Sequence, residues 1–411
     1  MFKIQQKCQI SNFKDLKRII NLGNFVPVNN FQKTKKKSLI QKKFPLDLMY
    51  SKKSNLIQIN CILPKEIIFP KDYPYTSSTT KILRDNFVDL AKKIKKKIKL
   101  EKMDTVMDIG CNDGNLLKNF LLDSNTLGIS PEDIIKNARK IGINTIQGYF
   151  DNFTVKKVIK KYGKIKVITA TNVYAHIDNA NELTKNIKKC LHNEGIFVTE
   201  CHYAGSVIKG MQYDTVYHEH LRYYSLTSLN YILSKHDLKI FDYEMIKTHG
   251  GSIRVYCCNI KNKKIIIKKK KIEKLLSQEK KDFSQTNFEN FKNKVEKNKS
   301  QILELLSKLN KKNKKVYGVG APSRASTLIS YCSMRKNKIE KILEVKGSYK
   351  INKYMPGSNI KVVEESFGLK DNPDYLFLFS WHISKELIKS LRKKGFSGKF
   401  IIPLPNLKIV S

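Results

Sequence analysis

The stretch Asp104–Leu117, DTVMDIGCNDGNLL, decides the predicted fold of this chain. Its apolar run Val106–Ile109 predicts a buried β-strand, and Gly110 and Gly114 mark the turn that follows. A glycine turn between a first strand and a helix lets a ligand approach the backbone at the carboxyl end of the strand. The apolar residues after the turn predict that helix: Leu116, Leu117 and Phe120.

Strand and helix patterns alternate around this turn. Helical spacing of apolar residues predicts a helix over Lys81–Leu100, preceded by the polar, aromatic turn DYPYTSSTT, Asp72–Thr80. Alternation of strands with helices predicts a doubly wound α/β domain with a parallel sheet. The third strand ends in ATNVYAHIDN, which should bring Asn172 and His176 towards the glycine turn. The later strands are expected over Asn125–Ile129, Lys164–Thr171 and Gly195–Glu200.

The glycine turn has the pattern D-x-G-x-x-x-G and lacks the G-x-G-x-x-G of dinucleotide sites. S-adenosylmethionine (SAM) methyltransferases use such a turn, and a strand–turn–helix without a ligand is the alternative. An acid normally holds the ribose at the end of the second strand, where this chain has Ser130, with Glu132 and Asp133 just beyond. The candidate cofactor-binding residues are Asp108, Gly110, Asn112, Asp113, Gly114, Ser130 and Asn172.

The stretch Tyr213–Ser225, YDTVYHEHLRYYS, is the strongest candidate for chemistry. It places His218, Glu219 and His220 among four tyrosines. Imidazole transfers protons near neutral pH, a neighbouring carboxylate can orient it, and phenols donate hydrogen bonds to a developing oxyanion. The stretch therefore holds the groups for proton abstraction beside a carbonyl. A polar core edge without chemistry is the alternative, and zinc is a weaker one because H-x-H has no obvious third ligand.

A second α/β unit is predicted from Lys314 onward. The segment KKVYGVGAPSRASTLISY joins a strand, Val316–Val319, to a helix from about Ser323, through a turn like a mononucleotide-binding turn without its third glycine. Two such units can face each other across a cleft, where sites commonly lie. Buried strands are also expected over Asp374–Trp381 and Lys399–Pro405.

Two segments lie between the units. In THGGSIRVY, Thr248–Tyr256, Gly250 allows close backbone approach, and Ser252 and Arg254 offer contacts to phosphate or hydroxyl groups. An ordinary glycine turn into a strand is the alternative. The Lys-rich segment 261–315 carries a helical apolar stripe and predicts one or two connecting helices.

Length and composition indicate several domains in a cytoplasmic protein. The 411 residues are 41% apolar, which is enough for two or three domains with cores. No apolar run reaches about 18 residues, so no membrane span is expected. The N-terminus, MFKIQQKCQIS, lacks the apolar region of a signal peptide. Eight scattered cysteines without C-x-x-C indicate reduced thiols.

The net charge of +43 suggests an anionic partner, but its distribution argues against nucleic acid. Of 79 basic residues only eight are Arg, and Lys is spread over the whole chain. A nucleic-acid site would cluster its charge and use Arg. We therefore expect a small-molecule partner, with a charge that helps to attract a phosphorylated substrate.

Ten motifs together resemble the NDP-hexose C-methyltransferases of deoxysugar biosynthesis, and the resemblance covers nearly the whole chain. It implies an N-terminal module over residues 1–70 that resembles a zinc-binding domain, a Rossmann-like class I methyltransferase domain over 71–245, and a C-terminal α/β domain over 246–411 with the connector 261–315. It also implies a monomer. The motifs are, in order, LGNFVPVNNF, FPLDLMY, DYPYTSSTT, MDIGCNDGNLL, NVYAHI, YDTVYHEH, HGGSIRV, VYGVGAPSRASTLISY, KYMPGSNI and FIIPLPNLKIV.

The chemistry that the resemblance implies is SAM-dependent methylation of carbon in a 4-keto deoxysugar nucleotide. A base removes the proton beside the carbonyl, and the enolate carbon attacks the SAM methyl group. By resemblance His220 is the base, Tyr217 or His176 polarises the ketone, and Glu219 binds or orients the sugar. The family's aromatic hydroxyl matches Tyr75 or Tyr73. The candidate substrate-binding residues are Tyr73, His202, Tyr203, His249, Gly250, Ser252, Arg254 and Arg324.

The chain departs from the family at its metal module. The two C-x-x-C pairs read here as Cys8-Gln-Ile-Ser11 and Ser51-Lys-Lys-Ser54. Serine hydroxyls are poor zinc ligands, so we predict no structural zinc. In the C-terminal domain, Val345 stands near an expected acid, with Glu344 beside it. Two other functions stay open: a degenerate member that binds a sugar nucleotide without turnover, and a nucleic-acid methyltransferase.

Overall fold

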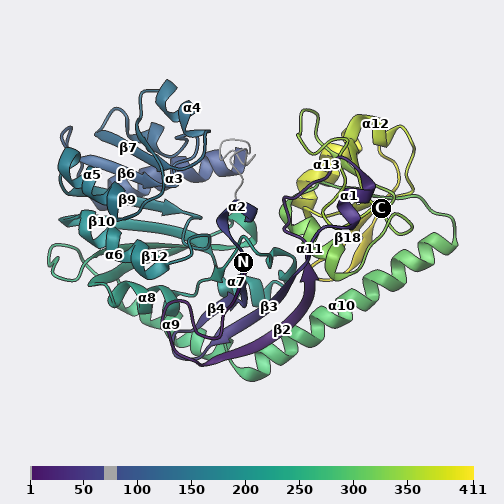
Figure 1. The fold of residues 1–411 in the computed structure, drawn as a ribbon, viewed down its shortest axis with the longest axis horizontal. Coiled ribbons are helices and arrows are strands. Elements are labelled where there is room, and N and C mark those ends of the chain that lie inside the picture. The colour runs from purple at the N-terminus through teal and green to yellow at the C-terminus, as the bar shows by residue number, and fades with distance from the viewer. Residues whose placement is uncertain (1, 69–80) are drawn as a thin grey trace.

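A computed structural model describes residues 2–68 and 81–411 and contains two α/β bodies (Figure 1). An N-terminal module and a long helix lie along one side of the molecule and join the two bodies. The predicted turn Asp72–Thr80, with Tyr73 and Tyr75, lies outside the described residues. Within the described ranges, no helix is both long and apolar enough to cross a membrane.

The first body is built on a seven-stranded sheet with the order β12-β13-β10-β9-β6-β7-β8. Strands β6 to β10 are parallel, and β13 runs antiparallel between β10 and β12. The order reverses beside β6, so the glycine turn opens at the switch point where ligands bind in such sheets. The strands are β6 (Thr105–Ile109), β7 (Asn125–Ser130), β8 (Asn144–Gln147), β9 (Ile165–Thr171), β10 (Leu191–His202), β12 (Leu238–Ile246) and β13 (Ser252–Asn259).

The predicted helix over Lys81–Leu100 is confirmed as α3 (Lys81–Lys97), but the structure differs from the prediction after the glycine turn. The predicted helix there is only a 3-10 helix, η1 (Leu117–Phe120). Asn119 donates its side-chain amide to the carbonyls of Asn115 and Leu116, which competes with helical bonding, and β7 begins soon afterwards. The α-helices are α3 (Lys81–Lys97), α4 (Ile135–Lys140), α5 (Asn152–Tyr162), α6 (Ala180–Cys190), α7 (Ala204–Lys209) and α8 (Leu226–Ser234).

The N-terminal module contributes a four-stranded antiparallel sheet with the order β11-β4-β3-β2. Its edge strand β11 (Arg222–Tyr223) comes from the candidate catalytic stretch, far away in sequence. The other elements are β1 (Lys3–Ile4), β2 (Leu16–Phe25), α1 (Lys35–Leu39), β3 (Phe44–Ser51), β4 (Leu56–Ile59), β5 (Cys61–Ile62) and α2 (Lys65–Ile68).

Positions that would hold zinc in the resembling family form a hydrogen-bonded cluster here. The Cys8 Sγ and Ser54 Oγ atoms are 3.1 Å apart, and Ser54 Oγ donates to Ser51 Oγ at 3.1 Å. Ser51 in turn donates to both carboxylate oxygens of Asp15 at 2.9 Å. One thiol, one carboxylate and two hydroxyls do not fit a structural zinc ion, since such a site needs four thiolate, imidazole or carboxylate ligands and only two are present in this cluster.

Two helices connect the bodies, α9 (Lys269–Asp282) and the 27-residue α10 (Gln285–Lys311), as predicted for residues 261–315. The buried side of α10 shares one core with β2, β3, the segment 204–223 and the second body. The sheet of the first body continues past residue 246, the expected domain boundary, because β13 pairs with both β10 and β12.

The second body has a six-stranded sheet with the order β16-β15-β14-β17-β18-β19, parallel except for β19. The predicted strand Val316–Val319 and the helix from Ser323 are confirmed. Its elements are β14 (Val316–Val319), α11 (Ser323–Tyr331), β15 (Lys341–Glu344), β16 (Lys361–Glu364), α12 (Glu365–Leu369), β17 (Tyr375–Leu378), α13 (Ser384–Lys393), β18 (Lys399–Ile402) and β19 (Lys408–Val410).

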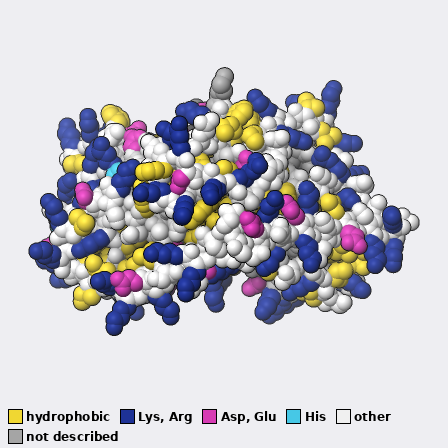
Figure 2. All heavy atoms as spheres, turned by 90° about the horizontal axis from the view of Figure 1, so that it is seen from below, with side chains coloured by type: hydrophobic (Ala, Val, Ile, Leu, Met, Phe, Trp, Pro, Cys, Tyr) yellow, Lys and Arg dark blue, Asp and Glu magenta, His cyan; other side chains and the backbone are white. Residues whose placement is uncertain are grey.

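Basic side chains are dispersed over the surface rather than gathered. Figure 2 shows Lys and Arg across one whole face, with acidic and hydrophobic side chains between them. This arrangement agrees with a solvated basic surface and offers no basic groove on that face.

Ser54→Ala should lower the free energy of unfolding by about 1–3 kcal/mol, because it removes the hydroxyl that bonds to the buried Cys8 thiol and to Ser51, which keeps only its bonds to Asp15. Urea denaturation measures this change. The exposed neighbour Lys52 gives the control, since Lys52→Ala should stay within about 0.5 kcal/mol of wild type. A chelator should leave the wild-type midpoint unchanged, and a lower midpoint would contradict this account of the module.

Candidate active site

The candidate catalytic stretch is clamped between the N-terminal module and the loop that follows β9. In β11, Arg222 pairs with Gln58 and Tyr223 with Ile57 of β4. On the other side, the Leu221 N–H donates to the Ala175 carbonyl at 2.8 Å. The loop that carries His176 is therefore tied to the stretch that carries His220.

Two hydrogen bonds fix the tautomer of His220. Its Nδ1 lies 3.1 Å from the Thr215 carbonyl, which can only accept, so Nδ1 carries the proton. Its Nε2 lies 3.0 Å from the Tyr217 hydroxyl and accepts from it. The basic nitrogen of His220 therefore faces the phenol of Tyr217. The Tyr223 hydroxyl also donates to the Thr215 carbonyl, at 2.7 Å, and holds that acceptor in place.

Aromatic and imidazole rings enclose His220. Its ring centroid lies 4.1 Å from Tyr217, 5.1 Å from His176 and 6.5 Å from His202. Burial holds the pKa of His220 well below its usual 6.5, and the neighbouring imidazoles His176 and His202 lower it further. Burial likewise lowers the pKa of His176 to about 4 and that of His202 to about 3. The cluster is therefore neutral near pH 7.

Glu219 is 4% exposed, and its polar atoms face three parts of the chain. Its backbone carbonyl accepts from His176 Nδ1 at 2.7 Å, which leaves His176 Nε2 as the acceptor nitrogen. Its side-chain Oε1 accepts from the Asn29 amide at 2.7 Å. Lys350 of the second body also lies within electrostatic range of this carboxylate.

Gln212, which no sequence pattern singled out, joins His202 to the glycine turn of Thr248–Tyr256. Its amide donates to the Gly250 carbonyl at 2.6 Å, and its Oε1 accepts from His202 Nε2 at 3.2 Å. Gly250 has a φ of +87°, and a Cβ there would lie 2.3 Å from Gln212 Oε1, so only glycine fits. His249 adopts a φ of 54°, and its Nε2 finds no hydrogen-bond partner among the described residues.

The second body closes the histidine cluster with Arg324, which is 7% exposed. Arg324 Nη1 lies 3.0 Å from His382 Nδ1, and its Nε lies 3.7 Å from Asp214 Oδ2. The Trp381 indole donates to Asp214 at 2.7 Å, so Arg324 and Trp381 both bind the beginning of the catalytic stretch. The Arg324 charge also lowers the pKa values of His202 and His249, after burial as the main cause.

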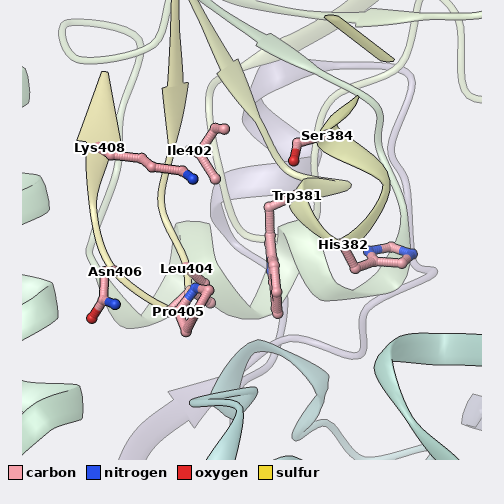
Figure 3. Close-up of a pocket in the computed structure, with 8 residues that line it drawn as sticks. All are labelled: Trp381, His382, Ser384, Ile402, Leu404, Pro405, Asn406 and Lys408. Carbon is pink, nitrogen blue, oxygen red and sulfur yellow. The ribbon is translucent and has the colours of Figure 1, made fainter. Parts of the chain in front are cut away.

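A cavity of about 280 Å³ lies beside this contact, at the carboxyl ends of β17 and β18. Figure 3 shows Trp381 and His382 on one side of it and Asn406 and Lys408 on the other. The cavity borders the histidine cluster through His382, which contacts Arg324.

Three predicted substrate contacts are instead structural. Arg254 is fully buried and donates to Glu200 Oε2 and Asp89 Oδ2 at 3.0 Å, so its guanidinium holds β10 and α3 together. The Tyr203 hydroxyl donates to Glu279 at 3.0 Å, and the Ser252 hydroxyl donates to a backbone carbonyl at 3.2 Å. In the structure these three side chains bind other groups of the protein.

His218, the other histidine of the stretch, points away from the cluster. Its Nε2 donates to the Pro45 carbonyl of the N-terminal module at 3.2 Å. Tyr73 and Tyr75 lie outside the described residues. The remaining candidates in the described ranges come together around one site: His176, His202, Tyr217, Glu219, His220, His249, Gly250 and Arg324.

The glycine turn after β6 has the backbone that the sequence predicts. Gly110 and Gly114 have φ values of +75° and +78°, and added Cβ atoms would lie 2.6 Å from Val173 and Ile143. Asn112 and Asn172 also adopt left-handed backbone, with φ values of 51° and 57°. Burial raises the pKa of Asp108 to about 7, although the Thr169 hydroxyl donates to it at 2.6 Å.

Acidic groups gather at this turn of a strongly basic chain. Asp108, Asp113 and Glu132 all act electrostatically on the Cys111 thiol, which places their carboxylates around the turn. The Ser130 hydroxyl donates to Glu132, whereas Asp133 accepts from Gln147 at 2.9 Å. The carboxylates around the turn fit SAM, because carboxylates bind the sulfonium, the ammonium and the ribose hydroxyls of this cofactor.

Comparison with known proteins agrees with this geometry. Residues 75–242 match a family model described as a methyltransferase domain, and residues 247–405 match one described as the C-methyltransferase C-terminal domain. The C-methyltransferase NovU of Streptomyces niveus is 24% identical, with alignment over 98% of this chain and 97% of NovU. The chain belongs to the C-methyltransferases. It is a methyltransferase enzyme.

Several solved methyltransferase structures resemble a part of this C-methyltransferase. A SAM-dependent methyltransferase from Clostridium acetobutylicum is 14% identical, and the match covers 44% of this chain and 93% of that one with a TM-score of 0.35. The magnesium protoporphyrin IX methyltransferase of Synechocystis PCC 6803 with bound SAM is 11% identical. That match covers 43% of this chain and 79% of the other, with a TM-score of 0.33. The fold assignment therefore rests on the strand order, in which β13 enters antiparallel between β10 and β12.

Proposed function

We propose that this C-methyltransferase methylates the carbon beside the carbonyl of a 4-keto deoxysugar nucleotide. The observation that carries the proposal is the 3.0 Å contact between the Tyr217 hydroxyl and the unprotonated Nε2 of His220. A ketone presents an acidified C–H and a carbonyl oxygen on neighbouring atoms. A base and a phenol within hydrogen-bond distance of each other match those two groups.

His220 acts as the base. Because the cluster is neutral, Nε2 is ready to accept the carbon proton, and the imidazolium that forms keeps its Nδ1 bond to the Thr215 carbonyl. Tyr217 turns its O–H from Nε2 to the ketone oxygen and stabilises the enolate. His176 is less suited to that task, since its Nδ1 proton is held by the Glu219 carbonyl. The buried surroundings strengthen the hydrogen bond to the enolate.

SAM supplies an electrophilic methyl group when it is bound at the glycine turn. In the proposal the backbone of Gly110–Gly114 receives the cofactor, and Asp108 and Asp113 face its positive charges. Glu132 replaces the usual ribose-binding acid, with Ser130 orienting its carboxylate.

Cations of the second body support an anionic substrate. Arg324 and Lys350 reach the site from the second body, on α11 and in the segment after β15, and both are largely enclosed. Arg324 faces Asp214 at 3.7 Å, and Lys350 faces the carboxylates of Glu344 and Glu219. The diphosphate of a sugar nucleotide would be a further anionic partner for both cations. Glu219 accepts hydrogen bonds and is suited to bind a sugar hydroxyl.

Purified protein mixed with SAM and dTDP-4-keto-6-deoxyglucose, or a 2,6-dideoxy or 3-amino analogue, should add one methyl group to the sugar, detected by mass spectrometry. His220→Ala should lower the rate roughly 10²-fold to 10⁴-fold, because it removes the base. His218→Gln is the matched control, since His218 faces Pro45 and the variant should keep the wild-type rate.

Bound SAM without methylation of any keto sugar would contradict the substrate class. Loss of both SAM binding and methylation would favour a degenerate protein that binds a sugar nucleotide without turnover.

Glu132→Gln should weaken SAM binding roughly 10-fold to 100-fold, because a charged acceptor for the ribose hydroxyls is lost. Isothermal titration calorimetry with SAM measures the change. Asp133→Asn is the matched control: Asp133 is exposed, accepts from Gln147 and should leave the affinity unchanged. Equal affinities for Glu132→Gln and wild type would show that another group holds the ribose.

A further inference from the structure

The loop that follows β2, residues 26–32, crosses from the N-terminal module to the second body. The Ser326 hydroxyl of α11 donates to the Val28 carbonyl at 3.1 Å. Gln32 forms a β-bridge with Tyr354, and a Cβ on Gly357 would lie 3.0 Å from Val26. The loop is therefore packed against the second body on both sides of Asn29.

The Asn29 side chain connects this loop to the candidate active site. Its Nδ2 donates to Glu219 Oε1 at 2.7 Å, across 190 positions of sequence. Its Oδ1 accepts a longer bond, 3.4 Å, from the Ser323 hydroxyl at the start of α11. A carboxylate can only accept and a hydroxyl can donate, so these two partners fix the orientation of the amide.

We propose that Asn29 is a positioning residue for methyl transfer, which orients the Glu219 carboxylate and couples that orientation to the seating of the second body. This inference rests on the proposed function. The N-terminal module, which has lost most of the family's metal ligands, thus supplies a polar group to the active site. Asn29 acts through Glu219 and touches no reacting atom itself.

The groups around Glu219 make a negative charge at position 29 a sensitive test of the positioning role of Asn29. The titratable groups that face Glu219 include Lys350 from the second body, near its carboxylate, and His176 from the loop after β9, which bonds to its backbone carbonyl. The Lys350 ammonium donates to the Ala321 carbonyl at 2.8 Å, and its pKa is lowered by burial. The Asn29 amide therefore holds Glu219 Oε1 close to an enclosed ammonium.

Asn29→Asp keeps the size of the side chain and places a second carboxylate against Glu219. Two carboxylates this close share one proton, so at low pH an O–H···O bond should restore the wild-type orientation. As pH rises the proton is lost, the carboxylates repel, and kcat should fall about 10-fold to 100-fold as Glu219 is displaced. The apparent KM for SAM should stay at the wild-type value.

The experiment measures kcat for the keto sugar nucleotide between pH 5 and pH 9, in wild type, Asn29→Asp, Ser323→Ala and Asn30→Asp. Asn30 is exposed and contacts only Gln32 and Gln41 with its polar groups beyond the turn, so Asn30→Asp should follow the wild-type profile. Ser323→Ala keeps the Asn29–Glu219 bond and removes the link to α11. It should lower kcat less than 10-fold, with no new pH dependence.

The outcomes separate this inference from the function on which it rests. Turnover by wild type, with an Asn29→Asp profile that falls as pH rises, supports the positioning role. Turnover by wild type with superimposable Asn29→Asp and Asn30→Asp profiles overturns it and leaves the proposed function intact. Absence of wild-type turnover overturns the proposed function and the positioning role of Asn29 together, because Asn29 can affect catalysis only if the protein catalyses this reaction.

Discussion

The pairing of β11 with β4 is the constraint on which the site depends. Two residues of the catalytic stretch, Arg222 and Tyr223, form the edge of the N-terminal sheet, immediately after His220. The buried Arg222 guanidinium also donates to Gln9 and to the Asp178 and Tyr174 carbonyls, which excludes a one-residue slip of this pairing. A small antiparallel sheet without chemistry of its own therefore fixes where the proposed base stands.

Enclosure then determines the chemistry that the cluster can perform. Neighbouring rings largely enclose His220, so its neutral form is favoured, and each ring nitrogen has a defined partner. The second body completes the enclosure through Arg324 and through the Trp381–Asp214 bond. The second body thus contributes basic side chains to the site, whereas acidic side chains surround the glycine turn of the first body. Opposite charges at the two sides suit a cationic methyl donor and an anionic acceptor.

The sequence predicts what local pattern controls, and it misses what long-range packing controls. Apolar runs and glycines predicted the strands and the turn of Gly110, because alternation and backbone freedom are local properties. The pattern could not show that Arg254 faces Glu200 rather than a ligand, since the partner lies on another strand. Asn29 carried no signal for the same reason: its contact with Glu219 exists only after three parts of the chain pack together. The sequence offered Glu132 and Asp133 as equal candidates for the ribose-binding acid. The structure distinguishes them, because Ser130 donates to Glu132 whereas Asp133 accepts from Gln147.

The most direct test of the account is solvent exchange at the carbon beside the ketone, because a base-generated enolate must form before methyl transfer. The enzyme is incubated in D₂O with a 4-keto deoxysugar nucleotide and S-adenosylhomocysteine, and deuterium is located by NMR. The account predicts enzyme-dependent incorporation at the carbon beside the carbonyl, absent in His220→Ala and retained in His218→Gln. Methylation by wild type without such exchange, or equal exchange in His220→Ala, would contradict His220 as the base.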